Sequence, residues 1–189
     1  MTHKLLLIIF LISFIFNQDK PDKEKEENIT LNTHPPEWTV SDWLNSKPLT
    51  INELQGNVLL IRWWTGPTCP YCINSAVALN EFYETYKNEG LEVLGFYHHK
   101  SRKPLTVESV KEMADDLGFT FPVAIDTDWK TLTDWWLRGH RRGWTSVTFL
   151  IDQKGIIRHI HPGGKYVKGD QDYAALKQAI ETLLAEGKD

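Results

Sequence analysis

The sequence predicts an α/β domain in three layers, in which a central mixed sheet is flanked by helices. Two observations carry this prediction. Short apolar runs bounded by turn residues alternate along the chain with segments whose apolar residues recur at helical spacing, and these patterns are typical of buried strands and amphipathic helices. The only two cysteines, Cys69 and Cys72, stand where a predicted buried strand passes into a predicted helix.

Length and composition limit the classes of protein that the chain can represent. A chain of 189 residues suits one domain with additional segments, and its eight tryptophans allow a sizeable core. The net charge of -4 gives no reason to expect nucleic acid as a partner.

The N-terminal segment predicts export. A short basic start is followed by an apolar run over residues 5–16. A run of that length fits the core of a secretory signal but is short for a spanning helix, which needs about 20 residues. We therefore interpret 1–17 as a signal peptide or N-terminal membrane anchor, 18–34 as a charged linker and 35–189 as the folded domain. The expected location is the periplasm or the outer face of the cytoplasmic membrane.

The first half of the domain predicts two parallel strands joined by a helix. Residues 37–44 carry large apolar side chains and are expected to form an edge strand or a packing arm. A buried strand is expected over 57–64, a helix over about 69–87 and a second strand over 91–97. Pro70 fits the first turn of that helix, where its missing N–H costs nothing. Because a helix separates the two strands, they are expected to pair in parallel.

The second half of the domain predicts two more helices, a hairpin and a closing helix. Thr106 opens a helix that Gly118 ends, and 121–126 is a short strand whose Pro122 indicates a strand start or a sheet edge. The other expected elements are a short helix over 129–136, strands over 146–151 and 156–160 joined by a hairpin turn, and an amphipathic helix over 173–184.

The spacing of the cysteines favours redox chemistry over a structural role. A helix start offers free backbone N–H groups and the positive end of the helix dipole, which stabilise a thiolate. Cys69 is therefore expected to be the attacking thiol, and Cys72, one turn further and more buried, the resolving thiol. A disulfide between them would close too small a loop to contribute much stability through chain entropy.

Neither a metal nor a cofactor is expected at this site. Two cysteines supply half of a zinc site, and the nearest histidines in the sequence, His98 and His99, lie on another loop. In thiol–disulfide exchange the dithiol itself is the redox group.

Five stretches of the chain carry a resemblance to a known family. They are 58–64, the Cys-Pro-Tyr-Cys segment 69–72, 91–95, 121–123 with Asp126, and 149–155. On these stretches the chain resembles the exported, membrane-associated thiol–disulfide oxidoreductases of the TlpA/ResA group, in the thioredoxin-like superfamily and related to redoxin and AhpC/TSA proteins. The resemblance implies a thioredoxin-like fold with an insertion, here 97–126, between its βαβ and ββα halves. It also implies protein thiol or disulfide substrates and a redox partner protein.

Three departures from the family pattern fall at the expected site. One residue more than usual precedes Cys69, and no tryptophan stands beside it. The intervening pair, Pro70 and Tyr71, is the one that glutaredoxins use. Ser146 stands where most of these proteins have a cis-proline. The bond that joins it to Thr145 is expected to be trans, because a cis bond without proline costs about 2.5–4 kcal/mol.

Further residues are candidates for substrate binding and proton transfer. Substrate contacts are expected from Pro70, Tyr71, Trp64, Thr145 and Ser146. His98 is a candidate proton shuttle to Cys72, because imidazole titrates near neutral pH. The basic turn 138–142 is expected beside the cysteines, either as a positive field or as a solvated turn. Arg62 lies inside a core strand and is expected to pair with a buried acid, for which Asp126 is a candidate.

The leading hypothesis is an exported oxidoreductase acting on protein disulfides, and two alternatives stay open. A thiol peroxidase of the peroxiredoxin type would carry a threonine three residues before its reactive cysteine and a proline seven before; Gly66 and Arg62 stand there. A copper-delivery module like the Sco proteins would space its cysteines C-x-x-x-C and add a histidine where Thr145 and Ser146 stand.

Overall fold

The computed structural model describes residues 29–187. The predicted signal peptide or anchor at 1–17 and most of the predicted linker lie outside the described residues, so the proposed division of the chain stays a prediction. Within 29–187, no helix is long and apolar enough to cross a membrane.

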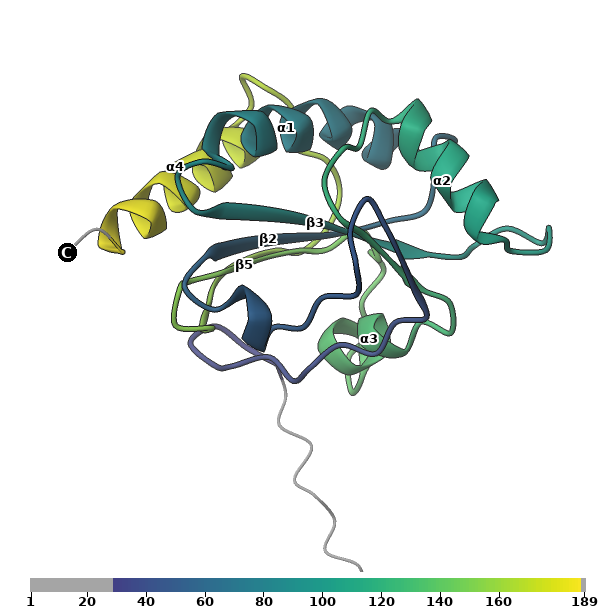
Figure 1. The fold of residues 1–189 in the computed structure, drawn as a ribbon, viewed down its shortest axis with the longest axis horizontal. Coiled ribbons are helices and arrows are strands. Elements are labelled where there is room, and N and C mark those ends of the chain that lie inside the picture. The colour runs from purple at the N-terminus through teal and green to yellow at the C-terminus, as the bar shows by residue number, and fades with distance from the viewer. Residues whose placement is uncertain (1–28, 188–189) are drawn as a thin grey trace, which may run out of the picture.

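A six-stranded mixed sheet forms the centre of the domain, with the strand order β1-β4-β3-β2-β5-β6 (Figure 1). The strands are β1 (Asp42–Leu44), β2 (Val58–Trp64), β3 (Leu91–His98), β4 (Val123–Asp126), β5 (Thr148–Ile151) and β6 (Ile157–His161). β2, β3 and β4 run parallel to one another, whereas β1, β5 and β6 pair antiparallel with their neighbours. The predicted parallel pairing of the first two core strands is therefore confirmed.

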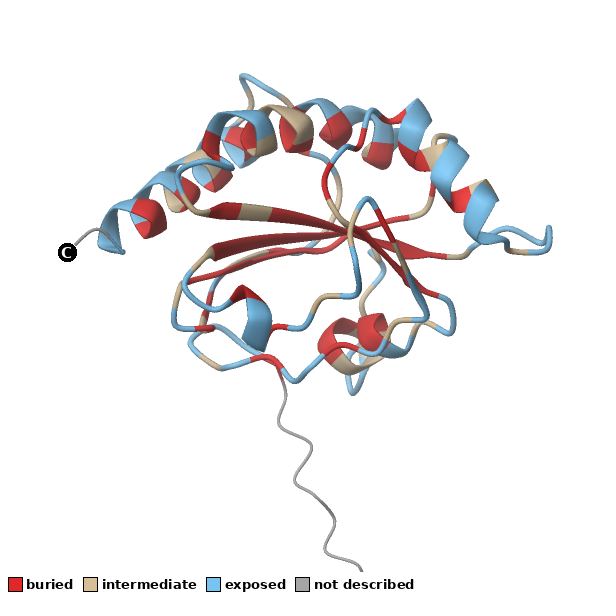
Figure 2. Cartoon of the chain, viewed as in Figure 1, coloured by how far each residue is buried: buried red, intermediate tan, exposed pale blue. Residues whose placement is uncertain are grey.

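Helices cover both faces of the sheet and give the three predicted layers. One face carries α1 (Pro70–Tyr86), α2 (Val107–Asp116) and α4 (Gln171–Glu186). The other face carries α3 (Lys130–Leu132), the π-helical turn η2 (Thr133–Leu137) and the short helix η1 (Asn52–Leu54). Figure 2 shows buried positions filling the strands and the sheet-facing sides of the helices. The predicted three-layer α/β architecture with a central mixed sheet is confirmed.

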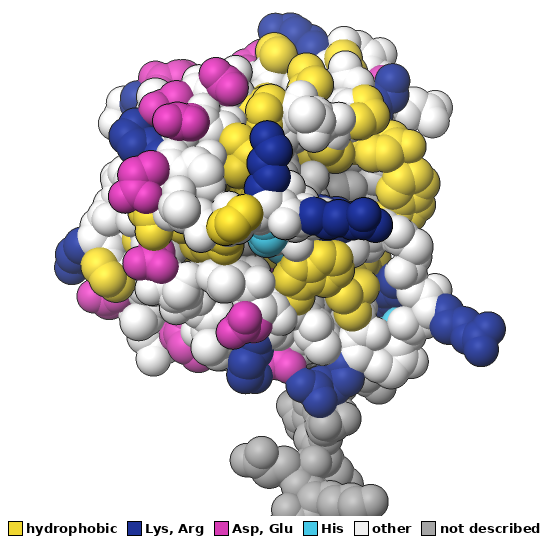
Figure 3. Space-filling view, turned by 90° about the vertical axis from the view of Figure 1, so that its right-hand side faces the viewer, with side chains coloured by type: hydrophobic (Ala, Val, Ile, Leu, Met, Phe, Trp, Pro, Cys, Tyr) yellow, Lys and Arg dark blue, Asp and Glu magenta, His cyan; other side chains and the backbone are white. Residues whose placement is uncertain are grey.

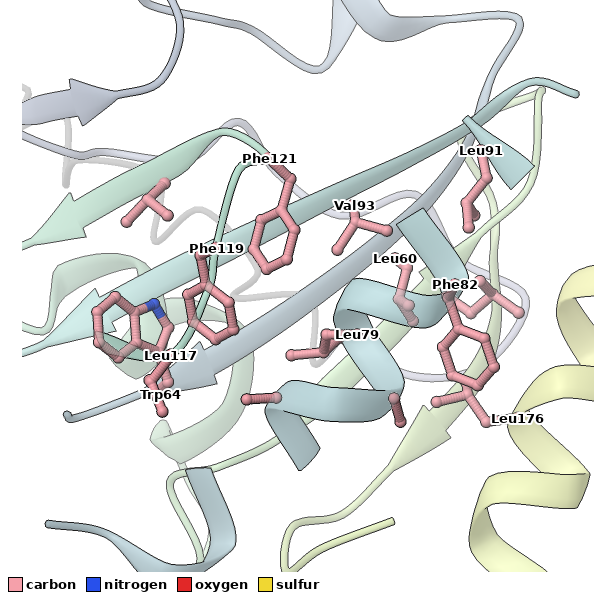
Figure 4. Packing of buried hydrophobic residues seen from close by; sticks show 14 of the residues in the cluster. Leu60, Trp64, Leu79, Phe82, Leu91, Val93, Leu117, Phe119, Phe121 and Leu176 are labelled. Atoms are coloured by element: carbon pink, nitrogen blue, oxygen red, sulfur yellow. The ribbon is translucent and has the colours of Figure 1, made fainter. Parts of the chain in front are cut away.

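Side-chain alternation along β2 divides the core into two clusters, because successive residues of a strand point to opposite faces. All seven residues of β2 are buried. Leu60 and Trp64 join the cluster beneath α1 and α4, whereas Ile61 and Trp63 join the cluster on the opposite face. Figure 4 shows Leu60 facing Leu79 of α1 across the first of these clusters. Each fully buried large apolar side chain contributes about 1.5–3 kcal/mol of transfer free energy, so this packing fixes β2 firmly beneath α1.

The predicted insertion 97–126 supplies α2 and β4. Thr106 caps α2 by accepting a hydrogen bond from the backbone N–H of Ser109, as expected of a helix start. Pro122 immediately precedes β4, which confirms its interpretation as a strand start. β1, within the predicted segment 37–44, pairs with β4 and forms the sheet edge.

Candidate active site

The two cysteines lie where β2 ends and α1 begins, at the carboxyl end of the parallel strands. β2 ends at Trp64, and a tight turn then delivers Cys69 to the N-cap of α1, with Pro70 in the first helical position. Gly66 adopts a φ of +132° in this turn, and its carbonyl accepts a hydrogen bond from the N–H of Cys69 at 3.1 Å. A Cβ on Gly66 would lie 2.9 Å from Sδ of Met113. Glycine therefore suits this turn both for its conformation and for its close approach to α2.

The two sulfur atoms occupy different environments. Sγ of Cys69 accepts a hydrogen bond from the N–H of Cys72 at 3.4 Å and is half-buried. Cys72 is only 3% exposed, and its sulfur receives the N–H of Thr65 at 3.5 Å. Cys69 is therefore the more accessible of the two thiols, and Cys72 lies deeper in the fold.

These environments move the two thiol pKa values in opposite directions. Burial opposes ionisation of Cys69, but hydrogen bonds from Cys72, from the Tyr71 backbone and from Thr65 outweigh it and lower its pKa. Burial, together with the neighbouring Cys69 sulfur, raises the pKa of Cys72. Because the thiolate is the nucleophile, Cys69 is chemically suited to attack first. Cys72 is suited to react later, with the sulfur beside it.

A cavity of about 320 Å³ opens over the dithiol and is called the dithiol cavity below. Its lining residues are Thr65, Cys69, Pro70, Tyr71, Cys72, Lys100, Gly143, Trp144, Thr145 and Ser146. They come from the β2–α1 junction, from the loop after β3 and from the loop before β5. Figure 3 views this end of the molecule, where hydrophobic side chains and Lys or Arg side chains share the surface.

Six predicted site residues are brought together around this cavity. They are Cys69, Pro70, Tyr71, Cys72, Thr145 and Ser146. The bond between Thr145 and Ser146 is trans, as predicted. The Ser146 hydroxyl accepts a hydrogen bond from the N–H of Gly164 at 3.1 Å, which fixes the wall opposite the cysteines.

Trp64, a predicted substrate contact, lies in the core instead of in the cavity wall. It is 1% exposed and packs edge-on against Tyr97 and Phe119. Figure 4 shows its indole among the buried apolar side chains. The face alternation of β2 places it there, because Trp64 follows Leu60 and Arg62 on the same side of the strand.

His98, the predicted proton shuttle, contacts the cavity through Thr145. Its Nε2 lies 2.9 Å from the Thr145 hydroxyl oxygen, and no hydrogen bond joins it to Cys72 in the part of the chain that the structure describes. His98 is fully buried, and burial, reinforced by the charge of Lys100, lowers its pKa to about 3. His98 is therefore neutral at physiological pH. Its imidazole holds the Thr145 side chain in place and adds no charge to the site.

Four cavity residues were not predicted: Thr65, Lys100, Gly143 and Trp144. Topology supplies a signal for two of them, because the carboxyl ends of adjacent parallel strands meet at one sheet edge. Thr65 immediately follows β2, and Lys100 follows β3 by two residues. The Trp144 ring stands edge-on to the ring of Tyr71, with centroids 4.9 Å apart. The path of the loop before β5 sets this contact, which strand and helix periodicity does not encode.

The predicted pairing of Arg62 with Asp126 is wrong. Arg62 points to the α1 face, where it donates to the Gly164 carbonyl at 2.7 Å and the Thr148 hydroxyl at 3.1 Å. Asp126 instead accepts a hydrogen bond from the indole N–H of Trp63, on the other face of the sheet. Neighbouring positions in β2 point to opposite faces, so an acid that contacts Trp63 is out of reach of Arg62.

The predicted basic turn 138–142 contacts the helical turn η2. Arg142 lies over the ring of Trp136, with its guanidinium carbon 3.5 Å from the centroid. The side chain of Arg138 pairs with Asp134. None of the arginines in this turn lines the dithiol cavity. Within 29–187, no cluster of three or more His, Cys, Asp or Glu residues is arranged to hold a metal ion.

Comparison with known proteins gives one family and several relatives. The AhpC/TSA family matches residues 31–160. The chain is 30% identical over 152 residues to the protein DipZ of Mycobacterium bovis, which covers 79% of this chain and 20% of DipZ. It is 26% identical over 155 residues to the thiol–disulfide oxidoreductase ResA of Geobacillus thermodenitrificans, covering 82% of this chain and 79% of ResA. The chain thus spans about a fifth of the full length of DipZ and most of the length of ResA.

The fold is also shared with solved structures. A thioredoxin-like protein determined in solution in its oxidised form superposes with a TM-score of 0.68 at 27% identity. The superposition covers 84% of this chain and 99% of that protein. This likeness confirms the predicted thioredoxin-like fold class.

Proposed function

The chain belongs to the AhpC/TSA family, and from this premise we propose that it is a thiol–disulfide oxidoreductase that exchanges electrons with protein disulfides through Cys69 and Cys72. Relatives named thiol–disulfide oxidoreductase ResA support the class of reaction. The observation that carries the proposal is the asymmetry of the dithiol. One thiol is half-exposed with a lowered pKa, and its neighbour is buried with a raised pKa.

The proposed reaction has two steps. The Cys69 thiolate attacks one sulfur of a substrate disulfide, so that a mixed disulfide forms and the other substrate sulfur leaves as a thiolate, which takes up a proton. Cys72 then loses its proton and attacks Sγ of Cys69. This step forms the Cys69–Cys72 disulfide and releases the second substrate thiol. Two electrons have passed to the substrate, and a dithiol partner protein returns the enzyme to its reduced form.

The wall opposite the cysteines is the proposed substrate contact. Pro70 and Tyr71 flank the attacking sulfur, and Thr145 and Ser146 line the facing side of the same cavity. A substrate segment entering between them would present its disulfide to Cys69. The Tyr71 and Trp144 rings would pack against its neighbouring residues.

The proposed location is outside the cytoplasm. The basic start and apolar run within residues 1–17 support an export signal or an anchor. The charged residues of 18–34 support a spacer that holds the domain away from the membrane or the cleavage point. An oxidising compartment supplies the disulfide substrates that the reaction requires.

Separate Cys69→Ala and Cys72→Ala variants test the proposed function. Each variant is mixed with a disulfide-containing protein substrate such as insulin, and covalent complexes are separated on non-reducing gels. We expect a trapped mixed disulfide with Cys72→Ala, because the resolving thiol is missing, and none with Cys69→Ala. The wild-type protein should complete the exchange and accelerate insulin reduction by dithiothreitol.

Two other readouts distinguish the alternatives. Hydroperoxide turnover that survives Cys72→Ala, without insulin reduction, would identify a thiol peroxidase. Tight copper binding that depends on both cysteines, again without insulin reduction, would identify a delivery module. A complex trapped equally by both single variants would contradict the division of labour between the two thiols.

A further inference from the structure

Lys100 brings a positive charge into the wall of the dithiol cavity. It lies in the loop after β3 and lines the same cavity as both cysteines. Its Nζ donates a hydrogen bond to the hydroxyl of Thr145 at 2.6 Å and lies 5.7 Å from the centroid of the Trp129 ring. An exposed lysine usually samples many rotamers, but these two contacts hold this ammonium group at the cavity wall.

The residues that hold Lys100 are themselves anchored in the fold. His98 is fully buried, and its Nε2 lies 2.9 Å from the same Thr145 hydroxyl. The His98 ring stands edge-on to Trp129 with centroids 5.0 Å apart, and the indole N–H of Trp129 donates to the carbonyl of His99 at 2.9 Å. Thr145 and Trp129 are therefore fixed supports, which reduces the entropy that Lys100 would lose on binding an anion.

The charge of Lys100 is not paired with a carboxylate of the cavity wall. Among the described residues, Lys100 forms no ion pair with a carboxylate, although eight other Lys or Arg side chains do so. It is the only Lys, Arg, Asp, Glu or His among the residues that line the cavity. A lysine held in place without a carboxylate is suited to bind one from another molecule.

We propose that Lys100 is a specificity-determining residue that selects disulfide substrates carrying an Asp or Glu side chain beside the cysteine that Cys69 attacks. This inference rests on the proposed function, because it names the substrate class of the same dithiol. The incoming carboxylate would accept a hydrogen bond from Nζ of Lys100 while the substrate disulfide lies against Cys69. Thr145 remains the support from which the ammonium group reaches the substrate.

Lys100 acts on the substrate and not mainly on the Cys69 thiolate. The principal groups that lower the pKa of Cys69 are Cys72, Tyr71 and Thr65, all on its own junction with β2. The net charge of the chain is -4, so general attraction of an acidic partner by the whole molecule is not available. Selection of an acidic substrate therefore depends on local charge at the cavity.

The test compares three peptides that differ at one position. Each contains the same intramolecular disulfide, with Glu, Gln or Lys next to the attacked cysteine, and single-turnover reduction by the prereduced full chain is followed. For the wild-type protein we expect the Glu peptide to react about fivefold faster than the Gln peptide, the scale of one partly screened ion pair. The preference should shrink as salt rises.

Charge variants at Lys100 test whether this residue causes the preference for the Glu peptide. Lys100→Gln should remove the Glu preference, Lys100→Arg should retain it, and Lys100→Glu should favour the Lys peptide. Lys154→Gln is the matched control, since it makes the same charge change in the β5–β6 turn at the opposite end of the sheet. The rate at which iodoacetamide alkylates Cys69 should change much less in Lys100→Gln than the ratio of the Glu-peptide rate to the Gln-peptide rate does, because the proposed effect is on the substrate.

The outcomes separate this inference from the proposed function. A Glu preference that persists in Lys100→Gln, or a loss of rate that is equal for all three peptides, would overturn the role of Lys100. Binding of the same peptides to the non-reacting Cys69→Ser/Cys72→Ser protein gives a readout without redox chemistry. A Lys100-dependent Glu preference in binding, with no reduction of any peptide by wild type, would retain the anion site and reject the oxidoreductase.

Discussion

At the scale of single residues, backbone geometry distinguishes two chemically identical thiols. Cys69 caps α1 and receives an N–H from the first helical turn, whereas Cys72 is inside that turn and covered by the core. A thiolate at an N-cap gains hydrogen bonds that the helix cannot satisfy internally. The lowered pKa of Cys69 and the raised pKa of Cys72 follow from this placement.

His98 gives the first prediction, which concerns acid stability. Burial and then the charge of Lys100 lower its pKa from the usual 6.5 to about 3. Between these two values the unfolded chain binds a proton that the folded chain does not, so the free energy of unfolding falls as the pH falls. Proton linkage at His98 alone removes up to about 5 kcal/mol across this window.

Urea unfolding of wild type and His98→Gln at pH 7, 5.5 and 4 measures the effect. The variant should be the less stable protein at pH 7, and its disadvantage should shrink or reverse by pH 4 because glutamine does not titrate. His140→Gln, at an exposed position, is the control and should follow the wild-type curve. Parallel curves for wild type and His98→Gln would contradict the prediction.

At the scale of elements, the junction between β2 and α1 determines where Cys69 stands. Four residues separate the end of β2 from Cys69, and Gly66 makes the sharp turn among them. Its φ of +132° is rarely adopted by other residues, and its Cα faces Met113 of α2. The junction therefore couples the thiol to a helix of the insertion.

Gly66→Ala should destabilise the protein and disturb Cys69 at the same time. A methyl group at this φ costs about 1–3 kcal/mol of backbone strain and also meets Sδ of Met113 at 2.9 Å. Denaturant unfolding measures the loss, and the pH profile of Cys69 alkylation reports the disturbance. Adding Met113→Ala should recover only the steric part of the loss.

Gly143→Ala is the matched control for Gly66→Ala. Gly143 lies in the same cavity wall, but an added Cβ meets nothing within 4 Å and its φ is not in the left-handed region. The free energy of unfolding of the Gly143→Ala protein should differ from that of wild type by less than about 1 kcal/mol. Equal losses in the two variants would contradict the role given to Gly66.

A helix or strand was predictable from the sequence where a local pattern of residues encodes it. Apolar runs and capping residues predicted β2, α1, β3 and α2, and the cysteine spacing predicted the dithiol. The predicted partner of Arg62 was wrong. Strand periodicity shows that neighbouring side chains point to opposite faces of the sheet, but the residue that each one contacts depends on tertiary packing. Lys100 and Trp144 were missed for a related reason, since loop paths depend on contacts distant in sequence.

At the scale of the whole molecule, the fold and the redox state of the dithiol are thermodynamically linked. The N–H groups that stabilise the Cys69 thiolate are arranged at the start of α1 only when α1 is folded against the sheet. The thiolate of the reduced protein is therefore stabilised in the folded chain by N–H groups that the unfolded chain does not hold in place. The four-residue loop closed by a Cys69–Cys72 disulfide restrains the unfolded chain less than a longer loop would.

The reduced protein should therefore be more stable to unfolding than the oxidised protein. By the thermodynamic cycle, each 30 mV by which the folded dithiol is more oxidising than the same dithiol in the unfolded chain corresponds to about 1.4 kcal/mol of extra stability of the reduced form. Part of this extra stability comes from the Cys69 thiolate, whose lowered pKa sets how that part changes with pH. This contribution is present above the pKa of an ordinary thiol and is lost as the pH falls through the folded pKa of Cys69.

Urea titrations of the oxidised and the anaerobically reduced protein, at pH values on both sides of that pKa, measure the difference directly. Reduction potentials of the folded protein and of the urea-unfolded chain, determined against dithiothreitol, give the same quantity independently. The Cys69→Ala/Cys72→Ala protein should unfold identically under both conditions, because it has no dithiol to couple to the fold. An oxidised form that unfolds at the same or a higher urea concentration would mean that helix formation does not stabilise the thiolate enough to outweigh the cross-link, and the assignment of Cys69 as a preorganised nucleophile would then fail.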